Sequence, residues 1–132
     1  MYYNWCGLAF ERVCFAHEEQ ILQALGISGI STAFYSWRTI PSKTTETGAQ
    51  IDLVIDRTDG VINLCEIKFT KEPLTVNADD ESNLETKIAR LSEEIHTDKA
   101  IHLVLISAKG LKKNEYSSIF QNIITLEYLF KP

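Results

Sequence analysis

Three ionisable residues interrupt two otherwise apolar segments of this sequence. Asp52 lies within residues 50–55 (QIDLVI), and Glu66 and Lys68 lie within residues 65–68 (CEIK). Strand interiors disfavour Asp and Lys, and burying an unpaired charge costs several kcal/mol. A shared role for the three side chains explains their position, because two carboxylates and an amine together can hold a hard metal ion and act on a water molecule.

The spacing of the two segments predicts a β-hairpin, with strands from Gln50 to Arg57 and from Val61 to Phe69. A three-residue loop over 58–60, with Gly60 in the left-handed region, pairs Asp52 with Glu66. A two-residue turn would instead put the two carboxylates on opposite faces of the sheet. We expect the three-residue loop, which gives the hairpin one polar face and one apolar face. The polar face carries Gln50, Asp52, Glu66 and Lys68, and the apolar face carries Ile51, Leu53, Cys65 and Ile67.

Two carboxylates directly opposite each other have Cβ atoms about 5 Å apart and repel unless a cation lies between them. Hard oxygen ligands, with no His or Cys at ligand spacing, favour Mg²⁺ or Mn²⁺ over zinc. Lys68, on the same face as Glu66, is then placed to hold or activate a water molecule. The alternative is a structural ion pair in which Lys68 neutralises one carboxylate at a sheet edge.

The elements that must position these residues follow from the hydrophobic periodicity. Apolar residues at spacings of three and four predict one helix from Asn4 to Leu25, with its stripe formed by Phe10, Cys14, His17, Ile21 and Leu25. Further elements are a strand over 32–38, a helix from Asp79 or Asp80 to His96, a strand from Ala100 to Ser107, a short helix from Asn114 to Asn122, and a strand or helical turn from Ile123 to Phe130. The core order of helix, three strands, helix and strand predicts an α/β fold, a three-layer α/β/α mixed sheet.

Composition bounds the class of protein. The 132 residues, 45% of them apolar, fit a single domain over 1–132. Three cysteines with no CxxC pair argue against a disulfide framework or zinc ribbon and favour a reducing, cytoplasmic setting. Apolar runs of only a few residues exclude a membrane span. With a net charge of −5, any nucleic-acid contact must come from a local patch or from a fused or separate partner. Lys109, Lys112 and Lys113 are the candidates for it, unless they are only solvated surface.

The acidic and basic residues resemble the motif of the PD-(D/E)xK superfamily, the restriction-endonuclease-like fold. Ile51-Asp52 stands where that motif has Pro-Asp, and Glu66-Ile67-Lys68 matches its E-x-K. The resemblance implies a metal site on Asp52 and Glu66, with Lys68 acting on water. Similar proteins often carry a further acid in the first helix, a position matched by Glu11 in Ala9-Phe10-Glu11, although a helix glutamate is also commonly just solvated.

A longer pattern covers nearly the whole chain and looks like the C-terminal domain of a group of bacterial AAA-type ATPases. It comprises residues 5–11 (WCGLAFE), 48–52 (GAQID), 63–69 (NLCEIKF) and 110–114 (GLKKN). No GxxxxGK[ST] phosphate-binding loop occurs here, so the ATPase region is expected in cis or in trans. The resemblance implies a Mg²⁺- or Mn²⁺-dependent DNA nuclease, or, alternatively, a catalytically inactive interaction or regulatory domain that keeps the nuclease fold and serves an ATPase.

Overall fold

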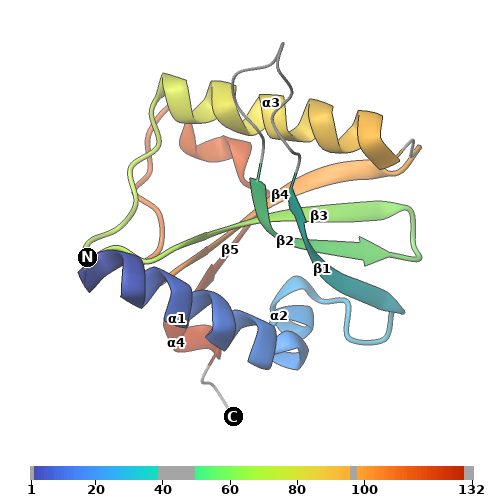
Figure 1. The fold of residues 1–132 in the computed structure, drawn as a ribbon, viewed down its shortest axis with the longest axis horizontal. Helices are drawn as coiled ribbons and strands as arrows, with labels where there is room; N and C mark the ends of the chain where they lie inside the picture. The colour runs from blue at the N-terminus through green and yellow to red at the C-terminus, as the bar shows by residue number, and fades with distance from the viewer. Residues whose placement is uncertain (1, 39–49, 96–97, 130–132) are drawn as a thin grey trace.

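The computed structural model describes residues 2–38, 50–95 and 98–129, and for residues 2–8, 38 and 50 it describes the backbone only. Five strands form one mixed sheet in the order β1-β2-β3-β4-β5 (Figure 1). The first three are antiparallel, whereas β4 runs parallel to β3 and β5 parallel to β4. The strands are β1 (Thr32–Arg38), β2 (Gln50–Arg57), β3 (Val61–Lys68), β4 (Ala100–Ser107) and β5 (Asn122–Thr125).

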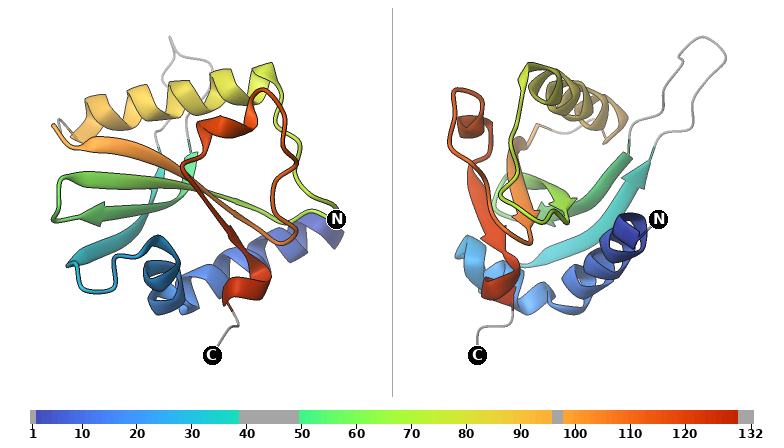
Figure 2. Two further views of the ribbon diagram at one scale, coloured as in Figure 1. Left: turned by 180° about the vertical axis from the view of Figure 1, so that it is seen from behind. Right: turned by 90° about the vertical axis from the view of Figure 1, so that its left-hand side faces the viewer.

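Helices cover both faces of this sheet, which gives the three layers predicted from the sequence. The helices are α1 (Tyr2–Ala16), α2 (Glu18–Leu25), α3 (Ala78–Ile95) and α4 (Leu126–Leu129). Helix α3 lies along one face, and α1, α2 and α4 lie on the other (Figures 1 and 2). A parallel pair such as β3 and β4 needs a crossover connection, and α3 supplies it. The fold is therefore α/β, as expected.

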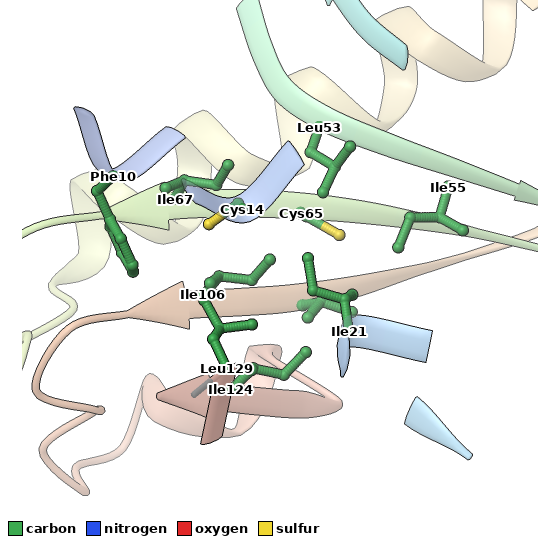
Figure 3. Packing of buried hydrophobic residues seen from close by; sticks show 11 residues of the cluster. Phe10, Cys14, Ile21, Leu53, Ile55, Cys65, Ile67, Ile106, Ile124 and Leu129 are labelled. Carbon is green, nitrogen blue, oxygen red and sulfur yellow. The ribbon is translucent and has the colours of Figure 1, made fainter. Parts of the chain in front are cut away.

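Two hydrophobic cores separate the layers. Between the sheet and α1, α2 and α4 lies what we call the α1-side core, shown in Figure 3: Phe10, Cys14, Ile21, Leu53, Ile55, Cys65, Ile67, Val104, Ile106, Ile124 and Leu129. The α3-side core lies beneath α3: Ile51, Val54, Ile62, Leu64, Val76, Leu84, Leu91, Leu103, Leu105 and Phe120. Because β3 and β4 are covered on both faces, their sequences are almost continuously apolar.

Helix α3 begins with a reciprocal pair of hydrogen bonds. The backbone N–H of Asp80 donates to the Asn77 side chain at 2.9 Å, and the backbone N–H of Asn77 donates to the Asp80 carboxylate at 3.0 Å. This capping arrangement satisfies two backbone donors at the helix start. Buried Leu84 and Leu91 then pack the helix onto the sheet. The predicted helix is confirmed within two residues, apart from His96, which lies outside the described residues.

The single helix expected from Asn4 to Leu25 is wrong, because the chain breaks at His17 into α1 and α2. His17 has φ −120° and ψ 40°, which is not helical backbone. Its Nδ1 donates to the Val13 carbonyl at 2.7 Å, so the side chain satisfies an acceptor at the end of α1. The apolar spacing of three and four was preserved across the break, and for that reason periodicity did not reveal it.

The C-terminal third also differs from the expectation. Instead of a helix from Asn114 to Asn122, the structure has one 3₁₀ turn over Ser117–Ile119, and β5 begins at Asn122. The Asn114 side chain accepts from the Tyr116 N–H at 2.8 Å and donates to the Val76 carbonyl at 2.8 Å, which favours a turn over a helix. Both alternatives for the last segment occur in succession, as β5 and then α4. Among the described helices, none has the length and apolarity that a bilayer crossing requires.

Candidate active site

The hairpin of β2 and β3 brings the acidic motif together in the predicted register. Strand pairs run from Asp56 with Ile62 to Leu53 with Cys65, which leaves residues 58–60 as the loop. Gly60 has φ +90°, a conformation that glycine adopts without a Cβ penalty. Continued by one residue, this register puts Asp52 at the level of Glu66. The three-residue loop is confirmed.

A β-bulge in β2 interrupts the alternation of side chains at Asp52. Tyr35 of β1 pairs with Val54, but Trp37 pairs with Ile51, so two residues of β2, Asp52 and Leu53, oppose the single residue between Tyr35 and Trp37. Bulges of this kind redirect side chains next to functional sites. Leu53 accordingly belongs to the α1-side core, whereas Ile51 belongs to the α3-side core.

The expectation of one shared polar face is therefore wrong in part. Ile51 does not share a face with Leu53, and the Asp52 carboxyl is hydrogen-bonded to Glu11 of α1. Glu66, by contrast, is bonded to α3. The alternation rule assumed an unbroken pleat, and the bulge breaks it. The side chain of Gln50, which was assigned to the same face, lies outside the described part of the chain.

Asp52 is half-buried and held from two sides. Its Oδ2 accepts a hydrogen bond from the backbone N–H of Ile67 at 3.0 Å. Its carboxyl also interacts with Glu11 of α1. Burial raises the pKa of Glu11 most, the charge of Asp52 and a hydrogen bond with it raise that pKa further, and the charge of Lys68 lowers it. Glu11 is thus not a merely solvated helix residue. The structure brings Glu11 close to Asp52, and its role as a metal-assisting acid stays a prediction.

Glu66 is the buried acid of the site, with 3% of its surface exposed. Its Oε1 accepts a hydrogen bond from Lys87 Nζ at 2.6 Å, and its Oε2 lies 3.9 Å from Lys68 Nζ. Burial raises the pKa of Glu66, the adjacent Lys87 opposes this shift, and the charge of Asp52 adds to it. The main counterion of Glu66 therefore comes from α3.

Lys87 is the site residue that the sequence analysis missed. It lies three residues after Leu84 and four before Leu91, and both leucines are buried against the sheet. Residues at these spacings share one face of a helix. A lysine on the apolar face of α3 was therefore visible in the sequence, and it indicates a buried acid opposite.

Lys68 ends β3 with half of its side chain exposed. The alternative in which Lys68 is the structural partner of a buried carboxylate does not describe this arrangement well, since Lys87 makes the 2.6 Å contact. A loose contact of 3.9 Å in solvent contributes little to stability. Lys68 is consequently an exposed ammonium group beside two acids.

The basic segment, residues 109–113, lies next to the end of β3 that carries Lys68. Lys68 pairs with Ser107 at the end of β4, and the N–H of Ala108 donates to the Lys68 carbonyl at 3.2 Å. The chain then continues along residues 74–76, with Leu111 bridged to Leu74. Three exposed lysines lie in this segment: Lys109, Lys112 and Lys113. The topology thus brings them to the end of the sheet where the acidic motif lies.

The two cysteines whose side chains are described belong to the core. Cys14 and Cys65 are both free and buried. Burial raises the pKa of the Cys14 thiol to about 12, with Glu11 and Asp52 adding to the shift, and burial likewise raises the pKa of Cys65. The prediction that Cys65 is a core residue and not a nucleophile agrees with these positions.

The donor set suits a hard cation, although the side chains as they lie are not a formed metal site. Within residues 2–38, 50–95 and 98–129, no three His, Cys, Asp or Glu side chains gather in a metal-binding group. Glu11 and Asp52 nevertheless lie near each other, and the charge of Asp52 raises the pKa of Glu11. A divalent cation between the two carboxyls would offset this repulsion, and carboxylate oxygens are the ligands that Mg²⁺ prefers.

No protein-family model matches this sequence, and no curated protein matches it. Among solved structures, the fold is similar to a crystal structure described as that of a protein of unknown function, AF1548, with a TM-score of 0.53 at 13% sequence identity. The similarity covers 89% of this chain and 64% of AF1548, so this chain spans less than two thirds of that protein's length. At this identity the likeness concerns the fold alone and agrees with an α/β architecture.

Proposed function

We propose that this chain is a metal-dependent phosphodiesterase domain of the restriction-endonuclease-like superfamily that acts on DNA. The observation that carries the proposal is the meeting of Asp52, Glu66 and Lys68 at the end of the β2–β3 ladder. Glu66 lies there 3.9 Å from the exposed Lys68, and the Asp52 carboxyl, level with Glu66 on the paired strand, is held by the Ile67 N–H. The order of the core elements is compatible with this superfamily, apart from the break at His17: α1 and α2, then β1 to β3, α3 and β4.

In this proposal Asp52 and Glu66 hold Mg²⁺ or Mn²⁺, and Glu11 assists through Asp52. The metal, when bound, polarises the scissile phosphate and stabilises the leaving oxygen. Lys68 orients the attacking water, for which its exposed ammonium group has three donors. The Ile67 N–H and Lys87 each hold one carboxylate oxygen and so fix the orientation of the acids.

DNA would be held mainly by the basic segment. The chain has a net charge of −5, so attraction to a polyanion must be local. Lys109, Lys112 and Lys113 are exposed beside the end of β3, where a phosphate backbone at the site would pass. The free, buried thiols agree with a reducing compartment, and we propose the cytoplasm.

The test is Mg²⁺-dependent nicking of plasmid and of branched DNA at low salt, with and without an AAA-type ATPase partner. Wild type should nick, and Asp52→Asn should not. Lys99→Met is the matched control, because Lys99 pairs with Asp56 at 2.7 Å at the hairpin-loop end of the sheet. A wild-type protein that binds Mn²⁺ and cleaves none of these substrates would exclude the nuclease proposal.

A second candidate is a non-catalytic interaction or regulatory domain for an AAA-type ATPase. One observation favours it: the acids have partners without a metal, since Glu66 is paired with Lys87 and Glu11 with Asp52. Calorimetric titration with Mn²⁺ separates the candidates, because an interaction domain has no need of the ion. Absence of Mn²⁺ binding by wild type would favour this second function.

A further inference from the structure

Each of the two strand acids has one oxygen with a short, well-defined hydrogen bond. Asp52 Oδ2 accepts the Ile67 N–H, and Glu66 Oε1 accepts from Lys87 Nζ at 2.6 Å. The second oxygen of Glu66, Oε2, faces the side of the exposed Lys68, 3.9 Å away. These contacts orient each carboxylate, and among the described residues the ion-pair contact of Glu66 Oε2 is the 3.9 Å approach of Lys68.

Lys87 comes from a rigidly placed element. Buried Leu84 and Leu91 fix α3 on the sheet, one turn on either side of Lys87. The Lys87 side chain is only 24% exposed, so its stem is packed and its ammonium group is directed at Glu66. The position of α3 therefore sets the orientation of the Glu66 carboxylate.

We infer that Lys87 is a positioning residue that holds Glu66 Oε1 and thereby presents Oε2 to the divalent cation. This inference rests on the proposed function. The opposite role, a lysine that competes with the cation, fits the geometry less well. Lys87 occupies Oε1, whereas the open oxygen lies on the Lys68 side. A cation that approaches from that side does not need to displace Lys87.

The first test is Mn²⁺ titration of folded, full-length variants by calorimetry, with circular dichroism to verify the fold. Groups that orient a metal ligand typically change metal affinity tenfold to about a hundredfold when removed. Lys87→Met should therefore weaken Mn²⁺ binding by at least about tenfold, and Lys87→Arg, which keeps the charge, should recover most of it. Lys99→Met, which removes a lysine that also pairs with a carboxylate, should bind as wild type does.

Three outcomes of this titration would overturn the inference. Unchanged Mn²⁺ affinity in Lys87→Met would show that Glu66 needs no anchor, and tighter binding would show that Lys87 competes with the cation. Failure of the Lys87→Arg variant to recover affinity, with the fold intact, would likewise contradict positioning by charge.

A metal-free experiment separates this inference from the proposed function and remains informative if Lys87→Met is unstable. Unfolding of Glu66→Gln, Lys87→Met and the double variant forms a double-mutant cycle. Loss of Lys87 alone leaves a buried carboxylate unpaired, so the two substitutions should couple by at least about tenfold in the unfolding equilibrium constant. No coupling would overturn the anchor itself. If wild type binds no Mn²⁺ but the coupling is present, the anchor stands and the metal-dependent function fails.

Discussion

Asp52 and Ile67 are joined across the hairpin by a side chain and not by the backbone ladder. The Asp52 Oδ2 accepts the Ile67 N–H at 3.0 Å, just beyond the last backbone pair, Leu53 with Cys65. The carboxylate therefore takes the place of a backbone carbonyl at the point where β2 leaves β3. A residue proposed to bind metal thus also satisfies a backbone donor in the sheet.

This double role predicts different results for two substitutions of Asp52. Asp52→Asn keeps an oxygen that can accept the Ile67 N–H, and its amide can donate to Glu11. Its unfolding free energy should be equal to or slightly above that of wild type, while Mn²⁺ binding is lost. Asp52→Ala leaves the Ile67 N–H without a partner and should destabilise by about 1–3 kcal/mol.

Chemical denaturation and Mn²⁺ calorimetry of both variants check this prediction. Equal destabilisation by Asn and Ala would mean that the Ile67 hydrogen bond contributes nothing. Unchanged Mn²⁺ affinity in Asp52→Asn would remove Asp52 from the proposed metal ligands.

Lys68→Ala should lose most activity and almost no stability. Lys68 is half exposed and 3.9 Å from Glu66, so its removal should cost less than about 1 kcal/mol. If it acts on the attacking water, nicking should fall by about a hundredfold or more, with Mn²⁺ affinity retained. The measurement is the nicking rate at several salt concentrations, where wild-type activity should fall as salt rises because salt weakens the lysine contacts with phosphate. A Lys68→Ala variant with full activity would exclude its assigned role.

Glu11→Gln should change the pH dependence of stability in a defined direction. Burial and the neighbouring Asp52 raise the pKa of Glu11 in the folded protein above its ordinary value of 4.5. A raised folded pKa means that the stability contribution is full below the unfolded pKa and is lost as pH rises through the folded pKa. The glutamine cannot ionise and avoids this loss.

Thermal melting from pH 4 to pH 7 checks the sign. Glu11→Gln and wild type should melt together at the acidic end, and the variant should melt higher as pH rises. Glu127→Gln, on the exposed face of α4, is the control and should show no such divergence. A Glu11→Gln variant that loses stability toward pH 7 would contradict the raised pKa.

Gly60→Ala should destabilise the hairpin, although the substituted position lies in the loop and does not contact the acids. Gly60 has φ +90°, and no atom lies within 4 Å of the position that a Cβ would take, so any cost is conformational. Left-handed backbone costs an L-residue roughly 1–2 kcal/mol. Gly29→Ala, which also meets open space but has no positive φ, should be within about 0.5 kcal/mol of wild type. Equal unfolding free energies for both variants would show that the loop tolerates a Cβ.

The hairpin register was predictable because it depends on local chemistry. The Asp-Gly pair at 59–60 places the turn, and the need to bring two acids level with each other selects the three-residue loop over the two-residue one, with which the observed pairs agree. The strand at 100–107 was equally clear, since a run that is apolar on both faces indicates helices on both sides.

The bulge at Asp52 and the break at His17 were not predictable in this way. The hydrophobic pattern continues before and after the bulge and before and after the break. The bulge changes only the alternation of side chains in β2, and the break changes only the direction of the chain between α1 and α2. The bulge is defined by pairing with β1, a contact that local sequence does not encode. Lys87 differs, because its place between Leu84 and Leu91 was a usable signal.

In a regular strand, successive side chains alternate between the two faces, so the position of a residue along the strand determines the face on which it lies. The extra residue in β2 breaks this parity, so Asp52 is level with Glu66 and yet joined to Glu11. The consequence is that a single carboxylate, Asp52, acts electrostatically on Glu11 of α1 and on Glu66, which is paired with Lys87 of α3. The charge on Asp52 raises the pKa of both acids, so the ionisation of groups bonded to helices on opposite faces of the sheet depends on one residue of β2.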